Sequence, residues 1–405
     1  MENKLLEDME YIGDIPEGWK WVKLGEIAEI KTGKTNSQDS DEMGNYPLFD
    51  RSRVIKRSKK FLFDTEAVII PGEGKEFIPR YYNGKFDLHQ RTYAIFNFKK
   101  SIPKFIYYNI LLNKDILKYF ATGSTVLSLR LEHFLNFPII LPPIEEQKAI
   151  VDVLSSIDDK IELLHRQNKT LEEMAMTLFR QWFIESTKNG LPDGWEEVSL
   201  GEFIKEVLSG DWGKDKPEGE YKVAVNCIRG TDISDLQNGL PKKTPVRFLK
   251  ESKFKLIEPK DGDIIIEISG GTEDQSTGRA IYINSLNRQL FEYPIVFSNF
   301  CRLLRPKENF YTYFLYLYLK YLYMNDELFS LENGTSGIKN LDYKALLYDL
   351  KYPMPKNTEI YLSFYENVSI LFEKIDKNKL QIQTLEKLRD TLLPKLMSGE
   401  IRVKI

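Results

Sequence analysis

The chain contains an internal repeat, and this repeat constrains the architecture more than any other feature. The first copy opens with Ile15-Pro16-Glu17-Gly18-Trp19 and continues with Leu24-Gly25-Glu26. The second copy opens 176 residues later (191 minus 15) with Leu191-Pro192-Asp193-Gly194-Trp195 and continues with Leu200-Gly201-Glu202. A repeat has to be identified before anything else, because overlooking it misassigns the whole fold. We therefore expect a pseudo-dimer within one chain, with two related globular units and a ligand of matching two-fold character.

Both copies continue in the same order. An aromatic and aliphatic stretch typical of a helix occupies 105–120 in the first copy and 311–323 in the second. A proline cluster follows at 141–143 and at 353–355, and each cluster precedes a long segment of mixed polar and apolar residues. With 405 residues and 42% hydrophobic side chains, the chain can form two cores with a spacer between them.

The two long segments carry heptad patterns. Apolar residues recur at spacings of four and three over 150–182 and over 364–396, which is typical of coiled coils. Each pattern contains one asparagine, Asn168 or Asn378, and an asparagine in such a seam is known to fix register. If the two asparagines meet, the helices pair antiparallel and the numbers of facing residues add up to 546 (168 plus 378).

That register makes further predictions. Trp182 would face Phe364, and Ile157 would face Arg389, whose long side chain we expect to extend out to solvent. We expect Pro394 to end or kink the second helix. The alternative arrangement has two amphipathic helices that pack on the globular units instead of on each other.

Forty helical residues span about 60 Å, a length of the same order as the ~34 Å between DNA half-sites on successive turns.

Composition and cysteine content indicate a cytoplasmic protein. Two cysteines, Cys227 and Cys301, cannot form a disulfide framework. The first ten residues are acidic and lack the apolar core of a signal peptide. The apolar stretch 313–323 is too short to span a bilayer. We expect no contact with a membrane.

Catalytic patterns are not found in the sequence. His89, His133 and His165 do not cluster with cysteines at metal-binding spacing. Asp261, Asp263 and Glu267 resemble a nuclease metal site only loosely, since a lysine at the expected spacing is missing. We therefore expect a chain without a catalytic residue, metal or cofactor of its own.

A basic run in the first copy suggests nucleic acid as the ligand. The run 51–60 holds six cations and no acid, and such side chains neutralise phosphates. A solvated surface is the other interpretation of the same run. Gln90 and Arg91 precede the strand-like segment 93–96, and glutamine and arginine are side chains that recognise adenine and guanine. The glycine loop 72–75 fits either a close approach to DNA or a plain tight turn.

These motifs together resemble the specificity subunit of type I restriction-modification enzymes. The resemblance covers nearly the whole chain. It is carried by the two opening motifs, by Leu141-Pro142-Pro143-Ile144-Glu145-Glu146-Gln147, and by the ending Leu392-Leu393-Pro394-Lys395-Leu396-Met397-Ser398-Gly399-Glu400-Ile401. It implies an α+β fold with two pseudo-twofold-related target recognition domains, each a mixed sheet plus helices, at 1–143 and 191–356. Between them it implies an antiparallel two-helix coiled coil, formed by spacer helices at 144–190 and, with the C-terminal tail, 357–405.

The resemblance also implies a function and partners. Each recognition domain would bind one half of a bipartite, asymmetric site in double-stranded DNA, and the helices would bind two methyltransferase subunits. Restriction subunits would join for cleavage. S-adenosylmethionine, ATP and Mg²⁺ would belong to the partner subunits, and this chain would be non-catalytic. The second helix opens with Pro355-Lys356-Asn357-Thr358-Glu359 instead of the motif of the first, so partner contacts at the two helices need not be equivalent.

Candidate DNA-binding residues follow from side-chain chemistry. They are Lys34, Arg51, Arg53, Arg57, Arg80, Gln90, Arg91, Ser124, Thr125, Lys214, Arg229, Arg247, Arg279 and Lys339. Two other interpretations stay open at this point. One is an enzyme with a concealed nuclease or methyltransferase site, and the other is a coiled-coil scaffold protein that does not recognise DNA.

Overall fold

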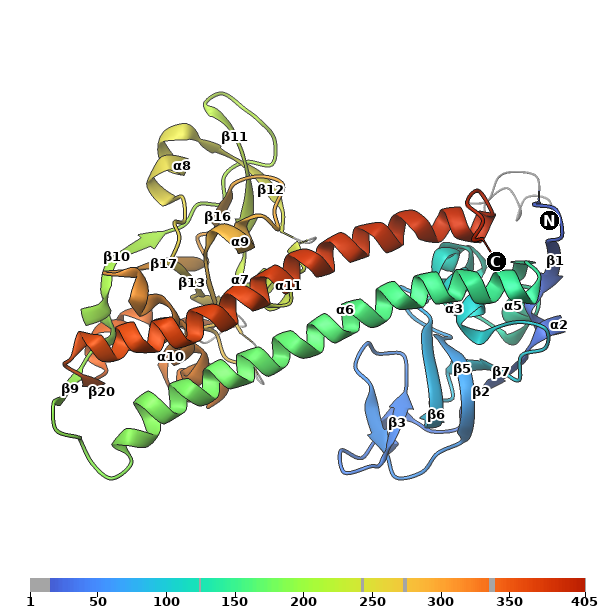
Figure 1. Ribbon diagram of the computed structural model, residues 1–405, viewed down its shortest axis with the longest axis horizontal. Coiled ribbons are helices and arrows are strands. Elements are labelled where there is room, and N and C mark those ends of the chain that lie inside the picture. Colours follow the sequence, from blue (N-terminus) through green and yellow to red (C-terminus); the bar gives the residue numbers. More distant parts are fainter. Residues whose placement is uncertain (1–14, 124, 242–243, 272–274, 335–338, 405) are drawn as a thin grey trace. The chain divides into compact units, whose positions relative to one another are not determined.

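The computed structural model describes residues 15–123, 125–241, 244–271, 275–334 and 339–404. The chain forms two compact units. Unit 1 comprises Met1–Asp159 and Lys387–Ile405, and unit 2 comprises Lys160–Glu386. Each unit mixes sheets with helices (Figure 1), which confirms the predicted α+β class. Within the described residues, none of the helices is both long enough and apolar enough to cross a bilayer.

Unit 1 is built on a mixed sheet with the strand order β2-β7-β5-β6-β3-β4, in which β3 and β6 are parallel. Its strands are β1 (Lys20–Lys23), β2 (Glu29–Thr32), β3 (Tyr46–Phe49), β4 (Lys56–Ser58), β5 (Phe63–Pro71), β6 (Arg80–Leu88), β7 (Thr92–Phe96) and β8 (Pro138–Leu141). Its short helices are α2 (Leu24–Ile27), α3 (Pro103–Leu112), α4 (Lys114–Phe120) and α5 (Leu131–Leu135). The helix α3 lies beside the sheet (Figure 1), because Phe105, Ile106 and Ile110 share one core with the inner faces of β5 and β7.

Unit 2 contains two larger sheets, with the strand orders β10-β17-β13-β15 and β12-β11-β16. Its strands are β9 (Trp195–Val198), β10 (Ile204–Ser209), β11 (Tyr221–Ile228), β12 (Val246–Lys250), β13 (Ile264–Glu267), β14 (Ser269–Gly270), β15 (Ala280–Tyr282), β16 (Ile295–Phe297), β17 (Cys301–Pro306), β18 (Glu332–Asn333), β19 (Lys339–Leu341) and β20 (Tyr352–Pro355). Its short helices include α7 (Gly230–Gln237), α8 (Glu251–Ile257), α9 (Ser285–Arg288) and α10 (Thr312–Met324). The apolar helix α10 is almost entirely buried in the core.

The sequence repeat corresponds to the same small ladder in both units. The strand after the first opening motif, β1, pairs antiparallel with β8, and β9 pairs antiparallel with β20. The repeated glycines have the same packing role. A Cβ atom on Gly25 would lie 2.7 Å from Leu135, and one on Gly201 would lie 2.5 Å from Tyr348. Only glycine allows such close approach, so each unit requires it at this position.

Each ladder leads directly into a long helix. These are α6 (Ile144–Phe179) and α11 (Thr358–Ser398). We expected Pro394 to end or kink the second helix, and the predicted end is wrong, because α11 continues four residues beyond it. Proline removes one helical hydrogen bond, but Leu393, Leu396 and Met397 are buried in the core of unit 1. Packing of this last turn offsets the missing bond.

Within each unit the segments of α6 and α11 lie side by side and run antiparallel (Figure 1). In unit 2, Asn378 Nδ2 donates a hydrogen bond of 2.8 Å to Asn168 Oδ1. The ring centroids of Trp182 and Phe364 lie 5.7 Å apart. Both pairs follow the register that the sequence predicts.

The same helices also pack on the globular part of unit 2, so the two arrangements weighed from the sequence coexist there. Phe179 from α6 and Phe364 and Phe372 from α11 belong to one core with α10. In unit 1, Arg389 does not extend freely into solvent as expected. Its side chain is only 24% exposed, and its Nη1 atom lies 3.2 Å from Asp158 Oδ1 on α6. This carboxylate gives the guanidinium group an ion-pair partner on the facing helix.

The two long helices begin in different surroundings. Near the start of α6, the buried Glu146 accepts hydrogen bonds from Trp19 Nε1 (3.0 Å) and from Arg402 (2.8 and 2.7 Å). Near the start of α11, Tyr361 is buried between aromatic rings and donates its hydroxyl to the carbonyl of Pro355. The start of α11 therefore packs against aromatic side chains, whereas the start of α6 is held by an ion pair. This difference corresponds to the different opening motifs of the two helices.

A buried polar cluster connects α11 to the sheets of unit 2. Asp376 is 1% exposed and accepts hydrogen bonds from Tyr282 Oη (2.8 Å) and Asn284 Nδ2 (2.7 Å). Lys379, one turn further along α11, is also buried, and its ammonium lies 3.3 Å from the same carboxylate. Tyr282, Asn284 and Lys379 thus all bind the carboxylate of Asp376.

Candidate nucleic-acid interface

In unit 1 the candidate cations gather where three loops meet, and carboxylates hold them. Arg51 Nη1 lies 2.8 Å from Glu73 Oε2, and Arg91 Nη1 lies 3.0 Å from Glu73 Oε1. Arg53 is paired with Glu76 at 2.6 Å. Carboxylates from the loop after β5 therefore lie beside the basic run 51–60 and neutralise part of its positive charge.

Asp50 fixes the start of this run. Its Oδ1 accepts hydrogen bonds from the backbone N–H and the hydroxyl of Ser52 (2.8 and 2.7 Å), and its Oδ2 lies 2.9 Å from Lys56 Nζ. Burial alone would raise the pKa of Asp50, but the hydrogen bonds from Ser52 and Lys56 outweigh it and lower the pKa to about 2. The carboxylate is thus charged at neutral pH and holds the loop in place.

An Asp50→Asn variant is expected to lose stability in a pH-dependent way. Because the pKa in the folded chain lies below the ordinary value of 3.8, the carboxylate contributes its full stability above that value and loses it as the pH falls through about 2. The difference in unfolding midpoint between wild type and variant should stay constant above about pH 5 and shrink toward pH 2. Urea unfolding at a series of pH values measures it. A difference that grows on acidification would contradict the assignment.

The other candidates of unit 1 have polar partners or lie exposed. Arg57 and Arg80 donate to backbone carbonyl groups of Gly44 and Ser52. Gln90 Nε2 donates to Asn36 Oδ1 at 2.6 Å. Lys34 and Thr125 are exposed, and Ser124 lies outside the described residues.

The candidates of unit 2 do not form one cluster in the described residues. Arg279 makes two hydrogen bonds, of 2.9 and 2.7 Å, to the fully buried Glu267. Arg247 pairs with Asp215 and stacks 4.3 Å from the ring centroid of Trp212. The side chains of these two arginines are only 15% and 7% exposed. Arg229 binds Asp232, Lys214 lies near Glu218, and Lys339 lies 3.0 Å from Glu332. Contact of any candidate with DNA stays a prediction.

The structure adds a feature that side-chain charge did not indicate. The turn between β16 and β17 carries Asn299 and Phe300 at the rim of a cavity of about 510 Å³, which Trp212 and Arg229 also line. Phe300 is 52% exposed, while its carbonyl accepts a hydrogen bond of 2.9 Å from Ile268 N–H. Because the ring of Phe300 is exposed while its backbone is held by this hydrogen bond, the ring is suited to contact a base. The sequence signal was an aromatic residue at a turn between two apolar strands.

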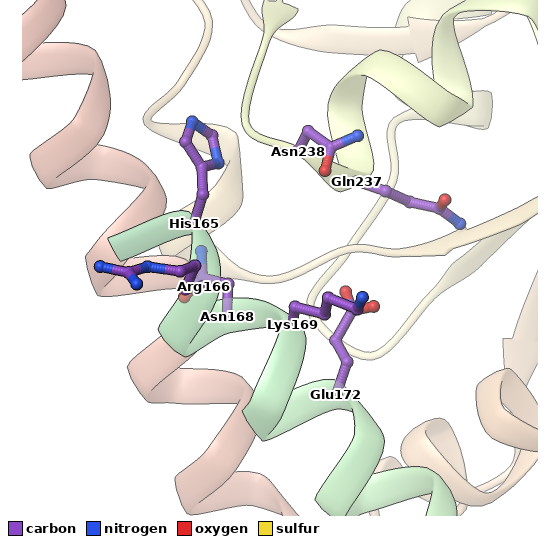
Figure 2. Close-up of a pocket in the computed structure, with 7 residues that line it drawn as sticks. All are labelled: His165, Arg166, Asn168, Lys169, Glu172, Gln237 and Asn238. Carbon is purple, nitrogen blue, oxygen red and sulfur yellow. The ribbon is translucent and has the colours of Figure 1, made fainter. Parts of the chain in front are cut away.

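A second cavity of unit 2, of about 410 Å³, lies between α6 and the end of α7. Figure 2 shows His165, Arg166 and Lys169 on α6 and Asn238 after α7 at its wall. Among the described residues, no three His, Cys, Asp or Glu side chains are placed to hold a metal ion. Asp263, considered above for a metal site, instead binds Arg305 at 3.0 and 2.9 Å.

Comparison with known proteins identifies the family. The model of the type I restriction modification DNA specificity domain matches twice, at residues 16–173 and 192–388. The type I restriction enzyme MjaIX specificity subunit of Methanocaldococcus jannaschii is 29% identical, over 97% of this chain and 96% of that protein. The MjaVIII specificity subunit of the same organism is 25% identical over 96% of this chain and 94% of its own.

A solved structure shares the fold. The S subunit of a type I restriction-modification system from M. genitalium superposes with a TM-score of 0.61 at 19% identity, and the match covers 98% of this chain and 99% of that chain. The two family matches together span most of the 405 residues. The chain therefore belongs to the type I restriction modification DNA specificity domain family and is a specificity subunit of a type I restriction-modification system.

Proposed function

We propose that this chain is the non-catalytic subunit that recognises a bipartite, asymmetric sequence in double-stranded DNA, one half with each repeat. The observation that carries the proposal is the double match of the DNA specificity domain, once over each copy of the repeat. The cationic loops of unit 1 and the aromatic turn of unit 2 provide two chemically different surfaces. Two different surfaces would bind two different half-sites, which makes the full site asymmetric.

The proposal extends to partners. The paired helices α6 and α11 would dock two methyltransferase subunits, and restriction subunits would join for cleavage. S-adenosylmethionine, ATP and Mg²⁺ would be bound by those partners. Support comes from the chemistry of the described residues, in which the buried acids Glu267 and Asp263 are occupied by arginines and do not form a catalytic cluster.

Methylation mapping tests the function. The chain is co-expressed with its methyltransferase subunit, and the host DNA is sequenced for modified adenines. One bipartite motif with a fixed non-specific gap is the expected result. If a soluble complex forms and no new methylated motif is found, the recognition role is refuted and the scaffold interpretation takes its place.

A Phe300→Ala variant should lose affinity for the mapped site. An aromatic side chain can contact a base edge in the groove of duplex DNA, for instance the methyl group of thymine. Loss of one recognised base pair costs about 1–3 kcal/mol, so the equilibrium constant for binding should fall about 5- to 150-fold. Since the ring is half exposed, thermal stability should hardly change. The matched control is Leu256→Ala, because Leu256 is 60% exposed on α8 of the same unit. Equal DNA affinities for the two variants would remove Phe300 from the interface.

A further inference from the structure

We propose that Glu73 competes with DNA phosphates for Arg51 and Arg91 and withholds both cations from non-specific DNA. This inference rests on the proposed function of the chain. In the DNA-free state one carboxylate holds both arginines, at 2.8 Å through Oε2 and at 3.0 Å through Oε1. Each carboxylate oxygen thus takes the place that a phosphate oxygen would occupy in a complex.

The backbone around Glu73 is fixed, so the carboxylate cannot easily turn away. Gly74 N–H donates to the carbonyl of Leu127 at 3.0 Å, and Glu73 forms a β-bridge with Ser128. Gly72 packs so closely that a Cβ atom there would lie 2.7 Å from the ring of Tyr93. The glycine loop is therefore a tight turn that holds the backbone of Glu73 in place. A close approach of this loop to DNA stays a prediction.

The two arginines are more accessible than the acid between them. Their side chains are 47% (Arg51) and 61% (Arg91) exposed, whereas that of Glu73 is 17% exposed. Ion pairs at such exposed positions stabilise a protein by about 0–1 kcal/mol. A phosphate or a base edge can thus take either arginine from Glu73 at small cost, provided that the complex supplies other contacts.

The competition makes the number of phosphate contacts depend on the DNA sequence. Non-specific binding depends on phosphate contacts alone, so each arginine that stays with Glu73 removes one such contact. At the recognised sequence, contacts to base edges add free energy, and the arginines exchange Glu73 for DNA. Glu73 therefore lowers the number of phosphate contacts on non-specific DNA, and at the recognised sequence its two ion pairs have to be broken before the arginines bind.

The test uses the complete chain in complex with its methyltransferase subunits and measures binding to the mapped site and to a scrambled duplex at several salt concentrations. For Glu73→Gln, the plot of log K against log salt on the scrambled duplex should steepen by about 0.9 to 1.8, since each additional phosphate contributes about 0.9. The slope on the mapped site should stay unchanged. The affinity for the mapped site should rise by up to about 25-fold, because the variant has no ion pairs to break on binding, and the affinity for the scrambled duplex should rise by no more than that.

Two further variants make the test specific. Adding Arg51→Gln and Arg91→Gln to Glu73→Gln should restore the wild-type slope on the scrambled duplex, because the released cations are then gone. The matched control is Asp115→Asn on α4 of the same unit, because its partner Lys118 is not among the candidate DNA-binding residues, and it should leave the slope unchanged.

The outcomes separate the inference from the function on which it rests. If wild type binds the mapped site and Glu73→Gln has the wild-type slope on scrambled DNA, the role of Glu73 is refuted. If the wild-type complex shows no preference for any sequence, the proposed function itself fails. Should Glu73→Gln not fold, Glu73→Ala still decides, since it removes the same carboxylate and should steepen the slope on the scrambled duplex in the same way.

Discussion

An Asp376→Ala variant should have a free energy of unfolding about 3–5 kcal/mol below that of the wild-type chain, because removing one partner of a buried ion pair leaves the other charge unpaired. Asp376 is buried, and Lys379, Tyr282 and Asn284 all direct polar groups at its carboxylate. The side chain of Lys379 is only 4% exposed, so water cannot replace the lost partner. Urea unfolding of the full chain, followed by circular dichroism, measures the change.

The control for this variant is Glu373→Ala on the same helix. Glu373 is 53% exposed and pairs with Lys377, and surface substitutions of this kind stay within about 0.5 kcal/mol. If Asp376→Ala were as stable as Glu373→Ala, the cluster would not connect α11 to unit 2 in solution.

Replacing both Asn168 and Asn378 by leucine should have the opposite sign. Asn378 is fully buried, and its Oδ1 has no hydrogen-bond partner in the described part of the chain. A buried polar atom without a partner costs about 1–3 kcal/mol, so the double variant should gain stability of that order. The single Asn378→Leu variant should gain less or lose stability, because Asn168 then loses its donor.

The measurement is again the urea midpoint, compared for the two single variants and the double variant. A double-mutant cycle isolates the coupling between the two asparagines. A coupling near zero would mean that the 2.8 Å hydrogen bond does not persist in solution.

Sequence periodicity predicted those features that repeat along the chain. The contact of Asn168 with Asn378 follows from two heptad patterns. The repeated opening motifs mark equivalent places in the two units, although the ladders β1–β8 and β9–β20 that they form were not predicted. These features depend on spacing, which a sequence displays directly.

Partnerships between distant residues could not be predicted in the same way. The basic run 51–60 showed no acid in sequence, yet Glu73 and Glu76 lie against it after a strand and a turn. Arg389 found Asp158 across the two helices. The predicted end at Pro394 failed for a related reason, since local propensity indicated a break and tertiary packing overrode it.

The division of the chain into units has a consequence for its synthesis on the ribosome. Unit 2 is one continuous segment, whereas unit 1 requires residues 387–405 to complete a core begun by its first 159 residues. At about 5–20 residues per second, the earlier part of unit 1 waits for tens of seconds. The first repeat to leave the ribosome therefore completes its folding last. Until then the apolar surface that Leu393, Leu396 and Met397 cover stays exposed and accessible to chaperones.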